Sequence, residues 1–159
     1  MKKLLLLLLV LVVGSVFVGC QSKDEEESFA IEMDMTLEEI IDAIYADSGL
    51  ELPGTMKSEL TKENMTYMLG VDNFEFLEGY ASEPMMSAQA HSVVLFTVDE
   101  KADIETIKKD IKENVDGRKW ICVGVEKENI LVDHAGQYVI LIMDERSEVL
   151  MESFHNIVK

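Results

Sequence analysis

The sequence predicts an α+β domain of two layers, in which about four antiparallel strands form two hairpins and helices pack on one face of the sheet. Segments with apolar residues three and four positions apart indicate helices at the start, in the middle and at the end of the domain. Between them lie two pairs of segments that favour strands. Strands joined in hairpins make antiparallel sheets, and helices must bury the apolar side of such a sheet.

The first helix is expected to begin after Thr36. The sequence Thr36-Leu37-Glu38-Glu39 is a capping-box pattern, in which the Thr hydroxyl and the Glu side chain satisfy each other's free backbone N–H groups. Gly49 follows the last apolar position, where a left-handed residue is needed. The apolar face of this helix consists of Leu37, Ile40, Ile41, Ile44 and Tyr45.

The middle of the chain predicts a short helix, a hairpin and a longer helix. The short helix is expected over 61–69 and is closed by Gly70. Residues 74–80 and 90–98 are expected to form the hairpin, the second segment being rich in β-branched and aromatic residues. The longer helix is expected over 99–114, because its isoleucines form a narrow apolar stripe.

The last part of the chain predicts a second hairpin and a final helix. Strands are expected over 129–133 and 137–143, with Gly136 available for a positive φ in the turn. The final helix is expected to start at Asp144, since acidic residues suit a helix N-terminus. Residues 120–127 extend the preceding helix or form a linking strand, and the sequence leaves both alternatives open.

Composition and charge exclude several classes of protein. The chain has 31 Asp and Glu against 14 Lys and Arg, which gives a formal net charge of -17. Nucleic acid is therefore not expected as a partner, because affinity for it comes largely from basic side chains. Two cysteines cannot make a disulfide-rich scaffold. A hydrophobic fraction of 48% is too high for a wholly disordered chain.

The first twenty residues are typical of a bacterial secretion signal. Two lysines precede an uncharged run over 4–18, which is shorter than the ~20 residues that a membrane span needs. The run ends in Val18-Gly19-Cys20, and this ending resembles a bacterial lipobox. The resemblance implies that the Cys20 thiol is diacylated and that the chain is cut just before it. An ordinary cleaved signal peptide and an uncleaved anchor helix are the alternatives.

This assignment predicts three parts: a lipoprotein signal peptide over 1–19, an acidic tether over 20–35 and a single domain over 36–159. Two acyl chains give stable anchoring where one does not. The protein is then expected on the outer, extracytoplasmic face of the cell membrane. A domain this acidic is repelled by anionic head groups and should stand off the bilayer on its tether.

Three stretches of the domain resemble a known family. They are Tyr67 to Asp72 (YMLGVD), Ser87 to Phe96 (SAQAHSVVLF) and Gly136 to Ile142 (GQYVILI). Together with the lipobox they resemble the small lipoproteins of Gram-positive bacteria called the domain of unknown function 4358 family. The resemblance covers roughly residues 37–156 and implies anchoring and fold. Because that family has no assigned activity, the resemblance implies no chemistry.

No catalytic motif occurs in the chain. Nucleophile elbows, phosphate-binding loops, zinc-protease motifs and calcium loops are all absent from the sequence. Cys122 stands in the apolar setting Trp120-Ile121-Cys122-Val123 and is expected to be a buried, inert thiol. A nucleophilic pairing of Cys122 with His91 or His134 is the alternative. We therefore expect no catalytic residue and no cofactor.

Histidines and methionines are the remaining candidates for a site. His91, His134 and His155 are not at metal-ligand spacing, although a metal site assembled in space stays open. His134 is expected to be solvated in its turn. Thioethers of Met33 with Met35, or of Met85 with Met86, could bind Cu(I), and the alternative is that these side chains fill the core and surface. No metal ligand is assigned.

The expected function is that of a lipid-anchored accessory or interaction module without enzymatic activity. Its partners would be the membrane, through the lipid at Cys20, and an envelope protein whose identity the sequence does not give. Two alternatives remain: a lipid-anchored protein that binds a ligand or metal, and an enzyme whose site is not recognisable from sequence.

Overall fold

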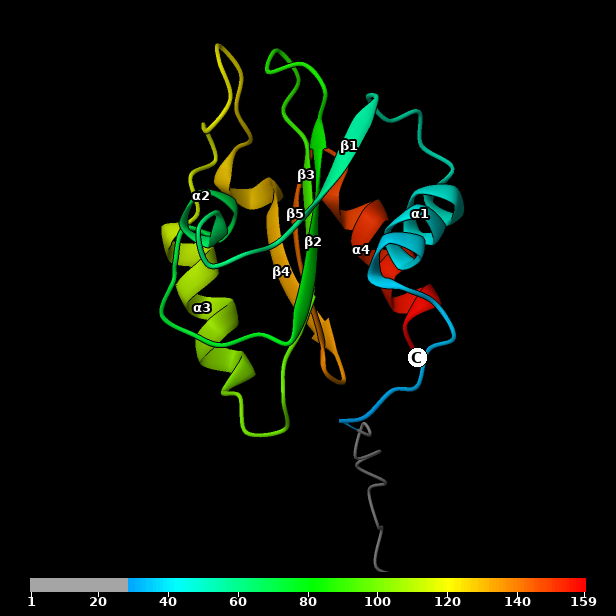
Figure 1. Ribbon diagram of the computed structural model, residues 1–159. Helices are drawn as coiled ribbons and strands as arrows, with labels where there is room; N and C mark the ends of the chain where they lie inside the picture. The colour runs from blue at the N-terminus through cyan, green and yellow to red at the C-terminus, as the bar shows by residue number, and fades with distance from the viewer. Residues whose placement is uncertain (1–28) are drawn as a thin grey trace, which may run out of the picture.

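The computed structural model describes residues 29–159, so the expected leader, Cys20 and most of the tether lie outside the described residues. Five strands form one antiparallel sheet in the order β1-β2-β3-β5-β4 (Figure 1). The strands are β1 (Thr55–Glu59), β2 (Glu78–Pro84), β3 (Ser92–Thr97), β4 (Ile130–Ala135) and β5 (Tyr138–Met143). The helices are α1 (Leu37–Ser48), α2 (Met65–Leu69), α3 (Ile104–Asn114) and α4 (Ser147–Ile157), with a 3-10 turn at Lys127–Asn129.

The helices cover both faces of the sheet, and the expectation of two layers with helices on one face is wrong. Helices α1 and α4 lie on one face, and α2 and α3 lie on the other (Figure 1). The reason is that the central strands have no polar face. All six residues of β5 are buried, as are five of the six in β3. A strand that is apolar on both faces must be covered on both.

Alternate residues of the central strands therefore belong to two separate cores. On the face of α2 and α3, the strands contribute Val94, Phe96, Val139, Leu141 and Met143. On the face of α1 and α4, they contribute Val93, Leu95, Ile140 and Ile142. Because side chains alternate across a strand, odd positions of β3 and even positions of β5 share a face. This parity also decides on which face the polar residues beyond the strand ends lie.

Several predicted elements are confirmed. Helix α1 begins after Thr36, whose side chain and that of Glu39 form both hydrogen bonds of the capping box, and Gly49 ends it with a φ of 62°. Both expected hairpins are present as β2 with β3 and β4 with β5, and Gly136 has a φ of 53° in the second turn. Gly70 closes α2 in the left-handed conformation.

Other boundaries differ from the prediction. Strand β1 was not predicted, because its sequence TMKSE is polar and short and shows no apolar alternation. Strand β2 shares only residues 78–80 with the segment expected over 74–80. Helix α3 begins at Ile104, since Asp103 accepts a hydrogen bond from the backbone of Thr106 and caps the helix there. Residues 120–126 form neither helix nor strand.

Within residues 29–159, every helix is too short or too polar to cross a bilayer. The described chain begins against the β4–β5 turn. The backbone N–H of Ile31 donates to Gln137 Oε1 at 2.7 Å, and Gln137 Nε2 donates to the carbonyl of Ile31 at 2.8 Å. Residues 29–31 are thus fixed at the end of the sheet where β4 turns into β5, which we call the tether end.

Replacing Ile107 by Asp should unfold the domain. Ile107 lies on the buried face of α3 with 6% of its surface exposed. An unpaired buried charge costs several kcal/mol, which is comparable with the stability of a small domain. The measurement is the thermal midpoint of the full chain, with Lys109→Asp on the exposed face as the control. Equal midpoints for the two variants would contradict the packing of α3.

Candidate functional site

A buried chain of polar side chains links α1, β3 and β5 at the end of the sheet opposite the tether end. Ser92 pairs with Met143 in the register, so His91 and Asp144 stand opposite each other just beyond the strands. His91 Nδ1 lies 2.8 Å from Asp144 Oδ2, and His91 Nε2 lies 2.8 Å from the hydroxyl of Tyr45 on α1. The His91 side chain is 0% exposed and that of Asp144 only 3%.

The Asp144 carboxylate is the charged centre of this chain. Burial by itself would raise its pKa, but hydrogen bonds from His91 and Arg146 outweigh burial and lower the pKa of Asp144 to about 2. Arg146 Nε donates to Asp144 Oδ1 at 2.9 Å. Because Asp144 is ionised and can only accept, His91 Nδ1 donates a hydrogen bond to its carboxylate, and Nε2 faces the Tyr45 hydroxyl. Burial raises the pKa of Tyr45 and keeps its hydroxyl protonated.

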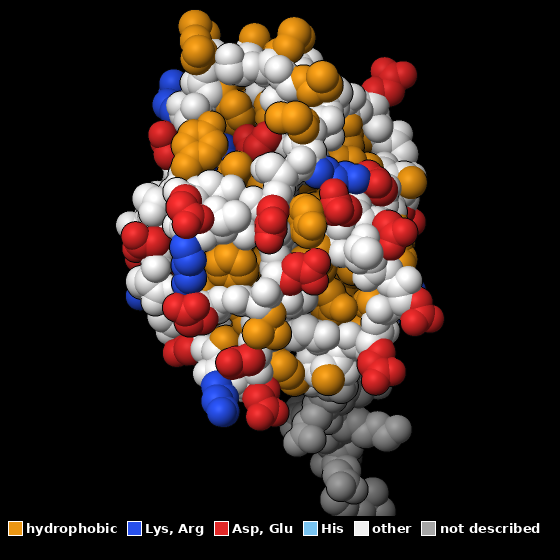
Figure 2. All heavy atoms as spheres, viewed as in Figure 1, with side chains coloured by type: hydrophobic (Ala, Val, Ile, Leu, Met, Phe, Trp, Pro, Cys, Tyr) orange, Lys and Arg blue, Asp and Glu red, His pale blue; other side chains and the backbone are white. Residues whose placement is uncertain are grey.

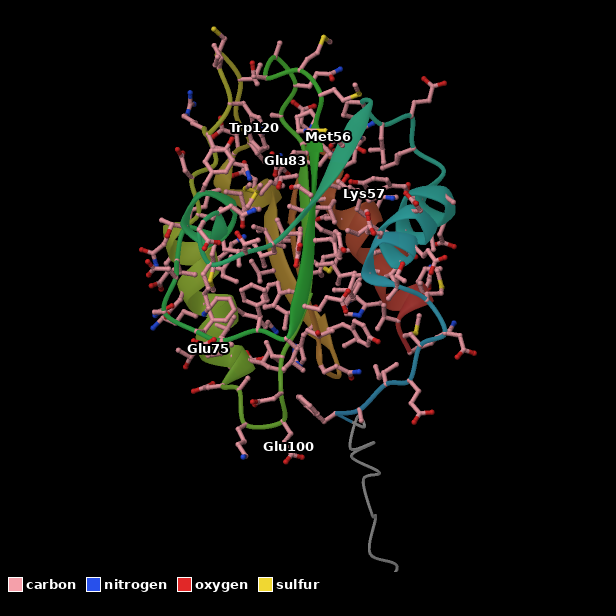
Figure 3. The ribbon with its side chains drawn as sticks, in the orientation of Figure 1. Met56, Lys57, Glu75, Glu83, Glu100 and Trp120 are labelled. Carbon is pink, nitrogen blue, oxygen red and sulfur yellow. The ribbon has the colours of Figure 1, made fainter. Side chains whose placement is uncertain are left out.

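A second polar cluster lies on the opposite face at the same end of the sheet. Lys119 Nζ lies 2.8 Å from Glu83 Oε1 and 3.3 Å from Ser92 Oγ, and the Ser92 hydroxyl also donates to Glu83. The Lys119 side chain is 2% exposed, and its ammonium lies 5.1 Å from the ring centre of Tyr67 and 5.4 Å from that of Trp120. Burial lowers the pKa of Lys119 more than Glu83 raises it. Figure 3 shows Glu83 and Trp120 together near this end.

A cavity of about 560 Å³ opens beside the His91 chain. Its polar lining includes Glu51, Gln89, Asp144, Glu145 and Arg146. Its remaining lining is Leu52, Pro53, Ala88, Ala90, Val123 and Gly124. The walls therefore come from the segment before β1, the β2–β3 loop, the loop after α3 and the start of α4. The cavity carries three carboxylates and one guanidinium.

The buried polar groups connect elements that are distant in sequence, and Asp144 also lines the cavity. A general base needs a free lone pair within reach of the reacting proton. Both ring nitrogens of His91 are hydrogen-bonded inside the protein, and Ser92 is fully buried with its hydroxyl bonded to Glu83. Both clusters instead connect segments that are distant in sequence. The His91 cluster joins α1 to β3 and β5 on one face, and the Lys119 cluster joins the loop after α3 to β2 and β3 on the other.

The structure corrects the expectation for Cys122. This residue is exposed and has a φ of 66°, so it is not a buried thiol. The apolar neighbours that suggested burial lie in different environments, because Trp120 is buried while Ile121 is 69% exposed. The pairing of Cys122 with His134 does not form, since the nearest charged or polar partners of His134 are Lys108, Asp133 and Glu105.

The three histidines lie at two ends of the sheet. His134 Nδ1 lies 3.2 Å from Lys108 Nζ, and His155 Nε2 lies 3.1 Å from Asp133 Oδ2, both near the tether end. The His134 side chain is 28% exposed, less than a solvated turn residue would be. Across residues 29–159, no three His, Cys, Asp or Glu side chains are placed to hold a metal ion together.

The two methionine pairs have different surroundings. Met33 and Met35 are half-buried and pack against the core beneath α1 and α4. Met85 and Met86, in the β2–β3 loop, are 72% and 62% exposed. The first pair therefore fills a gap in the core, and the second forms surface.

Sequence reasoning missed Tyr45, Glu83, Lys119 and Asp144 as members of polar clusters. Tyr45 fitted the apolar stripe of α1, and Asp144 fitted the acidic start of a helix. The signal that joins Asp144 to His91 is the pairing of β3 with β5, because each residue directly flanks an apolar strand. That pairing joins strands that are not neighbours in the sequence, so local patterns do not reveal it.

The comparisons with known proteins give no relatives. No family model matches the chain, and neither the curated proteins nor the solved structures give a significant match. The resemblance to the domain of unknown function 4358 family stays a prediction.

The Asp144 carboxylate should make stability fall in acid. Its pKa lies below the ordinary value of 3.8, so its contribution is present above about pH 4 and is lost as pH falls towards 2. The loss is on the order of 2 kcal/mol. We expect Asp144→Asn to be less stable than the parent at pH 7 and to lose less stability between pH 5 and 2.5. Urea unfolding at each pH measures this difference.

The control for this experiment is Asp72→Asn, at an exposed position. It should keep the parent's dependence of unfolding free energy on pH. If the curves of Asp144→Asn and the parent run parallel, the carboxylate of Asp144 does not contribute as described.

Proposed function

We propose that the protein is a lipoprotein anchored through Cys20 to the outer face of the cell membrane, where it acts as a non-enzymatic module that binds an envelope protein. The observation that carries this proposal is the orientation of the fold relative to the point where the chain enters it. The chain enters the domain at the tether end, and three segments without charged residues lie at the opposite end of the sheet (Figure 1). An anchor before residue 29 would direct that end away from the bilayer.

Three segments from different parts of the chain make up this opposite surface, which we call the loop end. They are residues 52–56, 84–90 and 120–125, and none of them contains Asp, Glu, Lys or Arg, although such residues make up 28% of the chain. The backbone N–H of Met85 donates to the carbonyl of Gly54 at 2.9 Å, and residues of all three segments line the cavity. In a protein of net charge -17 these three segments contain no charged residue, and the charged residues of this end line the cavity beside them.

Three further features support the proposal. The leader ends in Val18-Gly19-Cys20, the pattern of a lipobox, and the resemblance to small Gram-positive lipoproteins agrees with an anchor. Acidic side chains are spread over the face of the domain that Figure 2 shows, and the negative charge would hold the domain off anionic head groups. Both buried polar clusters have their groups engaged with each other, which favours binding over catalysis.

The anchor is tested by replacing each cysteine in turn. Cys20→Ala should release the protein from membranes or stop its maturation, because the acyl chains would be lost. Cys122→Ala, at an exposed position, should leave the protein membrane-bound. Cell fractionation and mass spectrometry of the N-terminus provide the readout. A Cys20→Ala variant that is still cut after Gly19 and still membrane-bound would refute the lipid anchor.

The direction of binding is tested by crosslinking in cells. A photoreactive benzoylphenylalanine at Ile121, in the loop end, should form a discrete adduct with one envelope protein. The same group at Leu77, which is 69% exposed outside the loop end, should not. Adducts are identified by mass spectrometry. The same adducts from both positions, or none from Ile121, would count against the loop end as the binding surface.

A further inference from the structure

Resting on the proposed function, we infer that the loop end binds a polypeptide segment of its partner in which an apolar side chain stands next to an Arg or Lys, whose cationic group enters the cavity between Glu51 and Glu145. Two independent features of the surface carry this inference. One is a group of exposed apolar side chains, and the other is a cavity lined by the exposed carboxylates of Glu51 and Glu145.

The apolar side chains are large and well exposed. Met56, Met85, Met86 and Ile121 are 66%, 72%, 62% and 69% exposed. In Figure 2 hydrophobic side chains gather at this end of the molecule. Exposed apolar surface concentrated in one place marks an interaction site more often than scattered residues do. Methionine side chains are flexible and polarizable, so such a surface adapts to the apolar group that it meets.

The cavity beside these side chains is suited to a cation. Asp144 is already engaged with His91 and Arg146, and Arg146 Nη1 also donates to the backbone carbonyl of Glu51 at 2.9 Å. The carboxylates of Glu51 and Glu145 are exposed and make no hydrogen bond or ion pair within residues 29–159. The lining therefore carries a net negative charge, because it holds three carboxylates and one guanidinium.

The shape of the lining favours a long basic side chain over a small cation. Leu52, Pro53, Ala90 and Val123 form apolar walls of the same cavity. Arg and Lys carry three or four methylene groups that pack on apolar surface while the charged head reaches carboxylates. At about 560 Å³, the cavity has room for one such side chain and its solvating water. An adjacent apolar residue of the same segment would then lie over the methionines.

A second copy of this chain is the weaker choice of occupant. Copies anchored in one bilayer would present their loop ends in the same direction, so a face-to-face pair would need one copy inverted. Each copy would also bring the exposed carboxylates of Glu51 and Glu145 to the same interface, and like charges brought together oppose association.

The test uses the full chain carrying ¹³C-methyl methionine and two peptides that differ in one charge. The probes are acetyl-Gly-Leu-Arg-Leu-Gly-amide and the same peptide with Glu in place of Arg. The Arg peptide should shift the methyl signals of Met85 and Met86 in a saturable titration and leave those of the buried Met65 and Met143 unchanged. The Glu peptide should bind about fivefold more weakly, the ratio that corresponds to the upper value for one exposed ion pair.

Matched variants locate the cationic group. Glu51→Gln with Glu145→Gln should lower the affinity for the Arg peptide about fivefold. Glu100→Gln with Glu113→Gln changes the net charge equally at exposed positions outside the cavity and should have no effect. Figure 3 shows Glu100 at the end of the molecule opposite Trp120.

Four results would overturn the inference: no saturable shift with the Arg peptide, equal affinity for both peptides, equal effects of the two double variants, or a concentration-dependent doubling of mass that shifts the same methyl signals without peptide. In each case the Cys20 and crosslinking experiments still report on the anchor and on the direction of binding. If a partner crosslinks at Ile121 but the protein shows no preference for the Arg peptide, the proposed function stands and the inference of a basic segment is wrong.

Discussion

The structure depends on one constraint, which is that β3 and β5 are apolar on both faces. Two adjacent strands of this kind can only lie at the centre of a sheet covered on each side. The helices must therefore divide, with α1 and α4 on one face and α2 and α3 on the other. The more polar strands β1, β2 and β4 then take the flanks, where their outward groups reach water.

The same two strands also determine where polar groups are buried. At one end of these strands, His91 lies just before β3 and Asp144 just after β5, and both of these polar residues are buried. Buried polar groups must be hydrogen-bonded, and a buried charge must be paired. Tyr45 and Arg146 meet this requirement on one face, as Lys119 does for Glu83 on the other. These contacts hold the loops of this end against the sheet.

Local signals in the sequence were sufficient for elements whose ends are set by nearby residues. The capping box at Thr36, the glycines at 49, 70 and 136, and the turn between β4 and β5 depend on contacts within a few positions. Strand β1 depends instead on pairing with β2 about 25 positions away, and its own residues carry no pattern. The prediction missed that helices cover both faces of the sheet. An apolar run indicates that a strand is buried, but it does not indicate whether one face or both faces are covered.

The candidate site was less predictable than the fold for a related reason. Cys122 was expected to be buried because its neighbours are apolar, yet in an irregular loop neighbouring side chains point in different directions. Trp120 and Val125 enter the core, while Ile121 and Cys122 are exposed. The loop end exists only when three uncharged segments from separate parts of the chain are brought together. A single uncharged segment is common in proteins and does not by itself predict a binding surface. Their convergence at the end away from residue 29, in a protein of net charge -17, places segments without charged residues where a partner beyond the membrane could reach them.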